Sequence, residues 1–164
     1  MIRNILFLCT GNSARSILAE AILEQRGKGR FHAFSVGSKP RGIPNPLAIA
    51  LLQAKGHATD HFRSKSWDEF AGPDAPDLHG VITVCDNAKG ESCPVWPGHP
   101  VQAHWGIPDP AGEGHDGDPR DFAIAYDRLA ERVERMLQLK EDQLDARAWR
   151  DALSAIGREC EGTS

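Results

Sequence analysis

A cysteine and an arginine stand close together near the start of the chain, separated by small and polar residues. The segment reads Cys9, Thr10, Gly11, Asn12, Ser13, Ala14, Arg15 and Ser16. A thiolate is a strong nucleophile, and a guanidinium can hold two oxygens of a tetrahedral oxyanion with its planar fork. The pattern therefore predicts a nucleophile, Cys9, at the start of an oxyanion-binding loop that comprises residues 10–16.

The flanking residues predict the elements that position this loop. Residues 2–8 form a nearly continuous apolar run, typical of a strand buried on both faces, and apolar residues then recur at helical spacing from Ala14 to Gln25. A loop between a strand and a helix can point backbone N–H groups inward, and the helix dipole adds positive potential that favours a thiolate. Gly11 permits the tight turn. The alternative, a structural cysteine, would lie inside the strand and not at its exit.

Similar patterns continue along the chain. Further strands are predicted at residues 31–36, 81–84 and 101–104, and helices at residues 46–55, from Asp118-Pro119 onward, and at residues 144–156. A strand, helix, strand order favours parallel strands with right-handed crossovers. We predict an α/β fold: a single-domain open parallel sheet of about four strands with helices on both faces. Residues 1–140 form the domain, and residues 141–164 form a helical C-terminal extension.

Three reactive residues fall at one edge of that sheet. Cys9 ends the first strand, Cys85 ends the third, and Asp109 lies in the loop after the fourth. Ligands of open α/β sheets bind beyond the carboxyl ends of the strands. The site is therefore expected at this edge.

Composition narrows the class of protein. The chain has 164 residues, 40% of them hydrophobic and 26% charged, which suits one globular domain. It contains no apolar run long enough for a membrane span and no cleavable signal sequence, so we expect a cytoplasmic protein without membrane contact. The net charge of −4 argues against a nucleic-acid partner. Four cysteines in such a chain indicate reduced thiols, metal binding or redox catalysis.

The loop resembles the active-site loop of the low-molecular-weight protein tyrosine phosphatase superfamily, and more narrowly the arsenate reductases built on that fold. The resemblance spans roughly residues 3–140. It continues through the sequences SVGS at residues 35–38, VITVCDN at residues 81–87, CP at residues 93–94 and HWGIPDPA at residues 104–111. It implies a low-molecular-weight phosphatase-like fold. The last two segments are the specific part, because true phosphatases share the first loop.

Two features of the resemblance separate a reductase from a phosphatase. Phosphatases of this fold usually carry Asp-Pro-Tyr, whereas this chain has Asp109-Pro110-Ala111, which keeps the general acid but lacks the aromatic wall. A reductase must also deliver two electrons, which a pair of thiols supplies on becoming a disulfide. The resemblance implies that Cys85 and Cys93 form this redox relay. Cys160 matches no motif and is interpreted as a bystander.

The resemblance further implies arsenate as the substrate and thioredoxin as the electron donor, with glutathione or glutaredoxin as the alternative donor. The runner-up enzyme is a phosphatase acting on phosphotyrosine or a small phosphomonoester. A non-catalytic thiol sensor of arsenite or oxidants is the third candidate. Asp109 argues against the sensor, because the capture of a metalloid by thiols needs no proton donor.

Neither a resident metal nor an organic cofactor is predicted. His57 and His61 have helical spacing, but Gly56 and Asp60 suggest a loop there, and no Cys-x-x-Cys pair exists. Members of the reductase family can hold a structural potassium ion near the loop. Asn12, Glu20 and Ser35 match part of that potassium site, but Ser66 stands where an acidic ligand is expected, which leaves potassium dependence open.

Overall fold

The computed structural model describes residues 2–84, 96, 100–107, 110 and 117–161. The strands are β1 (Arg3–Cys9), β2 (Phe31–Gly37), β3 (Gly80–Thr83) and β4 (Val101–His104). The α-helices are α1 (Arg15–Arg26), α2 (Pro46–Ala54), α4 (Pro119–Leu137) and α5 (Ala146–Glu161). Two short 3₁₀ helices are η1 (Trp67–Phe70) and η2 (Glu141–Gln143). The predicted strands and helices are confirmed with small shifts of their ends, whereas neither 3₁₀ helix was predicted.

The four strands form one parallel sheet in the order β2-β1-β3-β4. Cys9 at the end of β1 pairs with Gly37 at the end of β2, and Leu8 pairs with Thr83 at the end of β3. Because β1 lies in the middle of the sheet, strands flank it on both sides. The predicted α/β fold with an open parallel sheet of four strands is therefore confirmed.

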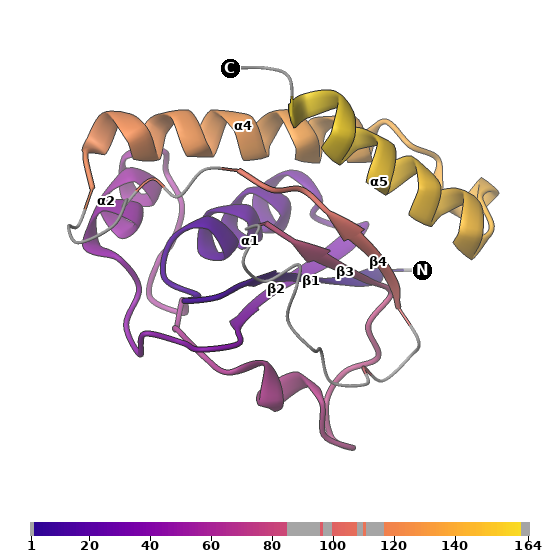
Figure 1. Cartoon of the computed structure of the whole chain (residues 1–164), viewed down its shortest axis with the longest axis horizontal. Helices are drawn as coiled ribbons and strands as arrows, with labels where there is room; N and C mark the ends of the chain where they lie inside the picture. The colour runs from indigo at the N-terminus through magenta and orange to yellow at the C-terminus, as the bar shows by residue number, and fades with distance from the viewer. Residues whose placement is uncertain (1, 85–95, 97–99, 108–109, 111–116, 162–164) are drawn as a thin grey trace.

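Both faces of the sheet are covered, one by α-helices and the other by the segment that contains η1. Neighbouring residues of a strand point to opposite faces. On β2, Ser35 contacts Glu20 of α1, whereas the ring of Phe34 lies 5.2 Å from that of Phe70 in η1. Figure 1 shows α1, α4 and α5 together above the sheet and η1 below it. Because it is covered on both faces, β1 is apolar along most of its length, as its sequence predicts.

Capping residues determine where two of the helices begin. The Asn45 side chain accepts a hydrogen bond from the Leu47 N–H, and Pro46 occupies the first helical position of α2. Asp118 caps α4 in the same way by accepting from the Arg120 N–H, with Pro119 first in the helix. Such caps satisfy N–H groups that the helix itself leaves without partners.

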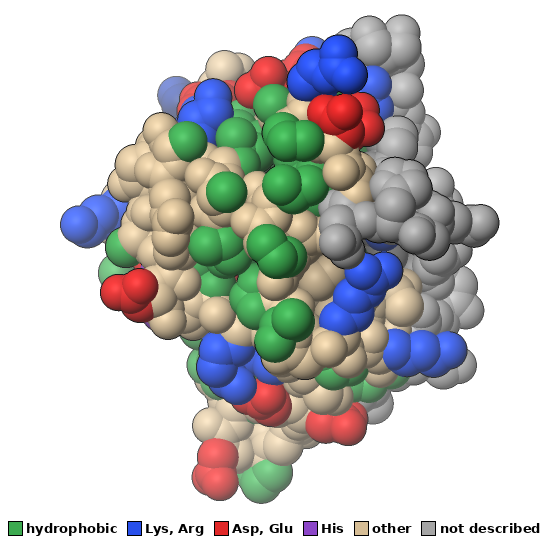
Figure 2. Space-filling view, turned by 90° about the vertical axis from the view of Figure 1, so that its left-hand side faces the viewer, with side chains coloured by type: hydrophobic (Ala, Val, Ile, Leu, Met, Phe, Trp, Pro, Cys, Tyr) green, Lys and Arg blue, Asp and Glu red, His purple; other side chains and the backbone are tan. Residues whose placement is uncertain are grey.

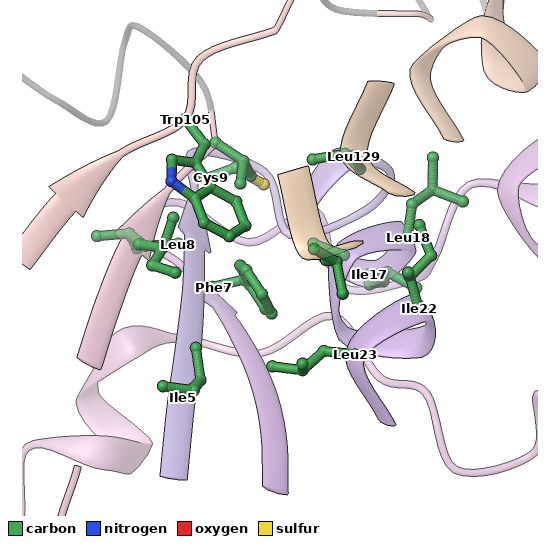
Figure 3. Packing of buried hydrophobic residues seen from close by; sticks show 14 of the residues in the cluster. Ile5, Phe7, Leu8, Cys9, Ile17, Leu18, Ile22, Leu23, Trp105 and Leu129 are labelled. Atoms are coloured by element: carbon green, nitrogen blue, oxygen red, sulfur yellow. The ribbon is translucent and has the colours of Figure 1, made fainter. Parts of the chain in front are cut away.

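Much of the hydrophobic core lies between the sheet and helices α1, α4 and α5. Figure 3 shows Trp105 and Cys9 at the upper left of the cluster, Phe7 near its centre and Leu129 toward the upper right. The rings of Phe7 and Trp105 are 6.1 Å apart, and both residues are completely buried. The Trp105 indole N–H donates to the Leu153 carbonyl of α5 over 2.9 Å, so α5 shares this core.

The carboxyl ends of the strands lie together at one end of the molecule. In Figure 1, β1 runs away from the N-terminus at the right, so this end is at the left, and Figure 2 looks onto it. Apolar side chains gather in the middle of this face, with charged side chains around them. No helix in the described part of the chain is long and apolar enough to cross a bilayer.

Candidate active site

Cys9 ends β1 at the entrance of the predicted oxyanion loop. The residue is 3% exposed, and its sulfur lies 3.0 Å from the Ser16 hydroxyl of α1. The Asn12 backbone N–H donates to the same sulfur over 3.2 Å. Hydrogen bonds of this kind favour a charged sulfur over a neutral one. The structure thus places a backbone N–H and a hydroxyl where both can donate to a Cys9 thiolate, and the thiolate itself stays a prediction.

The loop backbone is fixed by a segment that is distant in sequence, residues 38–45. N–H groups of this segment donate to the outward-facing carbonyl oxygens of the loop. The four bonds run from Ser38 to Cys9 (3.3 Å), from Lys39 to Thr10 (2.9 Å), from Arg41 to Gly11 (3.0 Å) and from Asn45 to Ser13 (2.8 Å). The C=O and N–H of one peptide group point in opposite directions. When the oxygens point out of the loop, the N–H groups therefore point into it, as in an anion-binding nest.

Two backbone features shape this nest. Asn12 adopts the left-handed region, with φ at 43°, which asparagine tolerates better than most residues. Gly37, at the end of β2, passes so close that a Cβ atom there would lie 2.5 Å from the Thr10 carbonyl oxygen. Glycine is therefore required at this point, since any side chain would push the loop away from β2.

A buried chain of hydrogen bonds lies behind the loop. The Asn12 side-chain amide donates to the hydroxyl of Ser16 over 2.7 Å and to that of Ser35 over 3.0 Å. The Ser35 hydroxyl in turn donates to the Glu20 carboxylate over 2.5 Å. Asn12, Ser16 and Ser35 are completely buried, and Glu20 nearly so. This chain connects Glu20 of α1 with Ser16, which contacts the Cys9 sulfur.

The Lys65 residue contributes to the same network in two ways. Its backbone N–H donates to the Asn12 side-chain oxygen over 2.9 Å, and its charge interacts with that of Glu20. Burial raises the pKa of Glu20, while the positive charge of Lys65 and the Ser35 hydrogen bond oppose that rise. Burial likewise lowers the pKa of Lys65, and the charge of Glu20 opposes the decrease. Each group thus offsets part of the cost of burying the other.

The residues that the resemblance matches to a potassium site are engaged in hydrogen bonds. The Asn12 side-chain oxygen accepts from the Lys65 N–H, and the Ser35 hydroxyl donates to Glu20. The Ser66 hydroxyl accepts from the Asp68 N–H at the start of η1. These oxygens are therefore engaged with N–H and O–H donors, and the charge of Lys65 supplies positive potential near Glu20. We assign no step to potassium.

Removing the Ser35 hydroxyl tests whether this buried chain supports the loop. We expect Ser35→Ala to lower the free energy of unfolding by about 1–3 kcal/mol, because Glu20 loses a buried donor and the Asn12 amide loses an acceptor. Ser38→Ala is the matched control, since the Ser38 hydroxyl is buried without a hydrogen-bond partner among the described residues. Denaturant unfolding of both variants measures the difference. Equal stabilities would show that the chain contributes nothing.

Arg15, the predicted oxyanion clamp, begins α1 directly after the loop. One of its guanidinium N–H groups donates to the Ile107 carbonyl oxygen over 3.1 Å. Ile107 belongs to the segment that follows β4, and its N–H donates to the Val84 carbonyl, while the Val84 N–H donates to Leu8. The C-terminal ends of β1, β3 and β4 and the residues that follow them therefore lie side by side, as the sequence predicts for this edge of the sheet.

The three other predicted reactive residues, Cys85, Cys93 and Asp109, lie outside the described residues. Val84 directly precedes Cys85, and Ile107 stands just before the Pro108-Asp109 pair. The structure therefore brings Cys9, Arg15 and the whole loop of residues 10–16 together. The roles of all five residues stay predictions.

A cavity of about 770 Å³ is lined by residues of α1, β2 and the segment 56–65. Its lining includes Glu20, Glu24 and His61, whose ligand atoms lie within 4.8 Å of one another. The His61 Nε2 atom is 2.9 Å from the Glu24 carboxylate. A hydrogen bond between these two exposed side chains therefore explains why they lie so close together. Lys65 also lines this cavity, and its positive charge opposes the binding of a cation there.

Comparison with known proteins identifies the family. Residues 4–147 match the family described as low molecular weight phosphotyrosine protein phosphatase. The match covers most of the chain, and the chain therefore belongs to this family of enzymes, which confirms the resemblance carried by the loop.

Similar members of the family are named arsenate reductase. The Bacillus licheniformis protein is 33% identical over 144 residues, which cover 85% of this chain and 98% of that relative. A Bacillus cereus protein is 34% identical over 139 residues, covering 85% and 97% of the two chains. Among solved structures, "An arsenate reductase in the phosphate binding state" matches with a TM-score of 0.68 and 26% identity, covering 83% of this chain and 97% of that one. An arsenate reductase from Archaeoglobus fulgidus matches with a TM-score of 0.59 and 28% identity, covering 79% and 98%.

Proposed function

We propose that this protein is a cytoplasmic arsenate reductase that serves arsenic detoxification. The proposal rests on the loop between β1 and α1. This loop joins a buried cysteine to an arginine, and its carbonyl oxygens are bound by residues 38–45. Such a loop suits a tetrahedral oxyanion, and a relative of this fold has been solved in a phosphate-binding state. Relatives named arsenate reductase, similar over most of the chain, support arsenate as the oxyanion.

The first chemical step joins sulfur to arsenic. The Cys9 thiolate attacks arsenate, and a hydroxide leaves as water after it takes a proton from Asp109. Arg15 holds two oxygens of the arsenate while the loop N–H groups hold others, so negative charge that develops on the oxygens is stabilised. The product is a covalent adduct of Cys9 with arsenic(V).

The second step transfers two electrons to arsenic. The Cys85 thiolate attacks the Cys9 sulfur, the sulfur–arsenic bond breaks, and its electron pair stays with arsenic, which leaves as arsenite. Cys9 and Cys85 are thereby oxidised to a disulfide. Cys93 then attacks Cys85, which releases the Cys9 thiolate and leaves a Cys85–Cys93 disulfide for thioredoxin to reduce.

The decisive experiment is arsenate-dependent oxidation of reduced thioredoxin, followed through NADPH consumption by thioredoxin reductase. Steady consumption that requires arsenate supports the proposal. Glutaredoxin and glutathione, supplied in place of thioredoxin, identify the alternative donor. A protein that consumes no thiol with arsenate but hydrolyses p-nitrophenyl phosphate would instead be a phosphatase, and one that does neither would leave the thiol sensor as the better proposal.

The role of Asp109 is tested separately. In a single turnover without an external reductant, Asp109→Asn should slow formation of arsenite by about 10²–10⁴-fold, the usual contribution of a general acid. Rapid quenching and measurement of arsenite determine the rate. A rate equal to that of the wild type would assign Asp109 to the turn alone.

A further inference from the structure

One charged side chain of the core has no part in the chemistry described so far. Arg132 lies on the inner face of α4 and is 1% exposed, among apolar residues such as Leu129, Val133 and Met136. Burying a guanidinium costs several kcal/mol unless it is well compensated, and an apolar side chain of similar size would fill the same space. The contacts of this buried charge therefore show which parts of the fold it can hold in place.

The contacts of Arg132 point toward the active site. One guanidinium nitrogen donates to the Arg128 carbonyl of its own helix over 3.0 Å. Another lies 3.5 Å from the Gly106 carbonyl oxygen, within the segment that follows β4. The guanidinium thus bridges the middle of α4 and the segment that contains Ile107.

The segment that follows β4 also binds the side chain of Arg15, which belongs to α1. The Ile107 carbonyl, the next one along the chain from that of Gly106, accepts a hydrogen bond from the Arg15 guanidinium over 3.1 Å. The residues on either side of Gly106 are fixed by hydrogen bonds to β3 and to the residue that follows it. The Trp105 N–H donates to the Thr83 carbonyl, and the Ile107 N–H donates to the Val84 carbonyl. Two successive carbonyl groups, Gly106 and Ile107, therefore each accept from an arginine, one from α4 and one from the oxyanion loop.

A guanidinium has five N–H groups, so one guanidinium can donate to the Ile107 carbonyl and to an oxyanion at the same time. The bond fixes the plane of the fork, and the position of the Ile107 carbonyl decides where that plane lies. A shift of this carbonyl would misalign the two oxygens that Arg15 is proposed to hold, because a bidentate grip depends on geometry as well as charge.

We propose that Arg132 is a positioning residue for the oxyanion clamp: it anchors the Gly106–Ile107 backbone, which in turn orients Arg15. This inference rests on the proposed role of Arg15 as the group that holds the oxyanion. It extends that role to a buried residue of α4.

Binding of inorganic phosphate to the reduced full-length protein tests the inference, because phosphate occupies an oxyanion site without oxidising the thiols. We expect Arg132→Met, which keeps the volume and removes the charge, to weaken phosphate binding about tenfold in isothermal titration calorimetry. Arg132→Lys should recover part of the affinity, since an ammonium can still donate to the Gly106 carbonyl. Arg135→Met is the matched control on the same helix. Arg135 pairs with Glu131 at the surface over 3.3 Å, and its removal should leave the affinity unchanged.

The possible outcomes separate this inference from the proposed function. A change in thermal stability of Arg132→Met with unchanged phosphate affinity would overturn the inference, because it would make Arg132 a packing residue only. If Arg132→Met fails to fold, Arg132→Lys decides, and an affinity equal to that of the wild type again counts against positioning. Failure of the wild type to reduce arsenate would refute the proposed function, while the phosphate comparison would still test the orientation of Arg15.

Discussion

Replacing Cys9 with serine should abolish arsenate-dependent turnover while leaving the fold intact. Serine nearly preserves the shape of the side chain and can keep the contacts with the Asn12 N–H and the Ser16 hydroxyl. A hydroxyl is a far weaker nucleophile than a thiolate near neutral pH, and it cannot form the disulfide that follows. We expect the rate of arsenite formation to fall by at least about 10⁴-fold, as when a catalytic nucleophile is removed from other enzymes.

Two controls make this result specific. Calorimetric titration with phosphate should show that Cys9→Ser still binds an oxyanion, because the N–H groups of the loop and Arg15 remain in place. Cys160→Ser removes a different thiol and should turn over arsenate at the rate of the wild type. Substantial arsenite production by Cys9→Ser would show that the nucleophile lies elsewhere, whatever the binding data give.

The fold could be predicted from the sequence because its signals are local. The apolar run of β1, the apolar period of α4, and the caps at Asn45 and Asp118 each identify an element within a few residues. A parallel sheet then follows from the alternation of strands and helices. The four-residue helix η1 was not predicted, since so short an element shows no period.

The site could be predicted only in part. Its reactive residues Cys9 and Arg15 are close together in the sequence, whereas the groups that hold the loop in place come from distant segments. Cys9 and Arg15 are predictable because their spacing coincides with a position between a buried strand and a periodic helix. The donors that hold the loop come from residues 38–45 and from Lys65, and their sequence carries no sign of this use. Arg132 is a similar case, since a polar residue in an amphipathic helix ordinarily indicates the exposed face. Only the three-dimensional structure shows that this one points inward.

The role of Cys93 offers the second test with a large effect. In the intact protein, arsenate without an external reductant should yield one equivalent of arsenite and a Cys85–Cys93 disulfide. Cys93→Ser should still release one arsenite, because Cys9 and Cys85 alone supply two electrons, but the relay should stop at a Cys9–Cys85 disulfide. Turnover with thioredoxin should then fall to a single event, since no thiolate remains to attack Cys85 and free Cys9.

Peptide mapping after alkylation of the free thiols distinguishes the two disulfides. The wild type should leave Cys9 alkylated, whereas Cys93→Ser should leave Cys9 protected in the disulfide with Cys85. The buried position of Cys9, 3% exposed, supports the need for a third thiol, because a protein reductant reaches a buried sulfur less readily than an exposed one. Full thioredoxin-driven turnover in Cys93→Ser would contradict this argument, since it would require direct reduction of the Cys9–Cys85 disulfide.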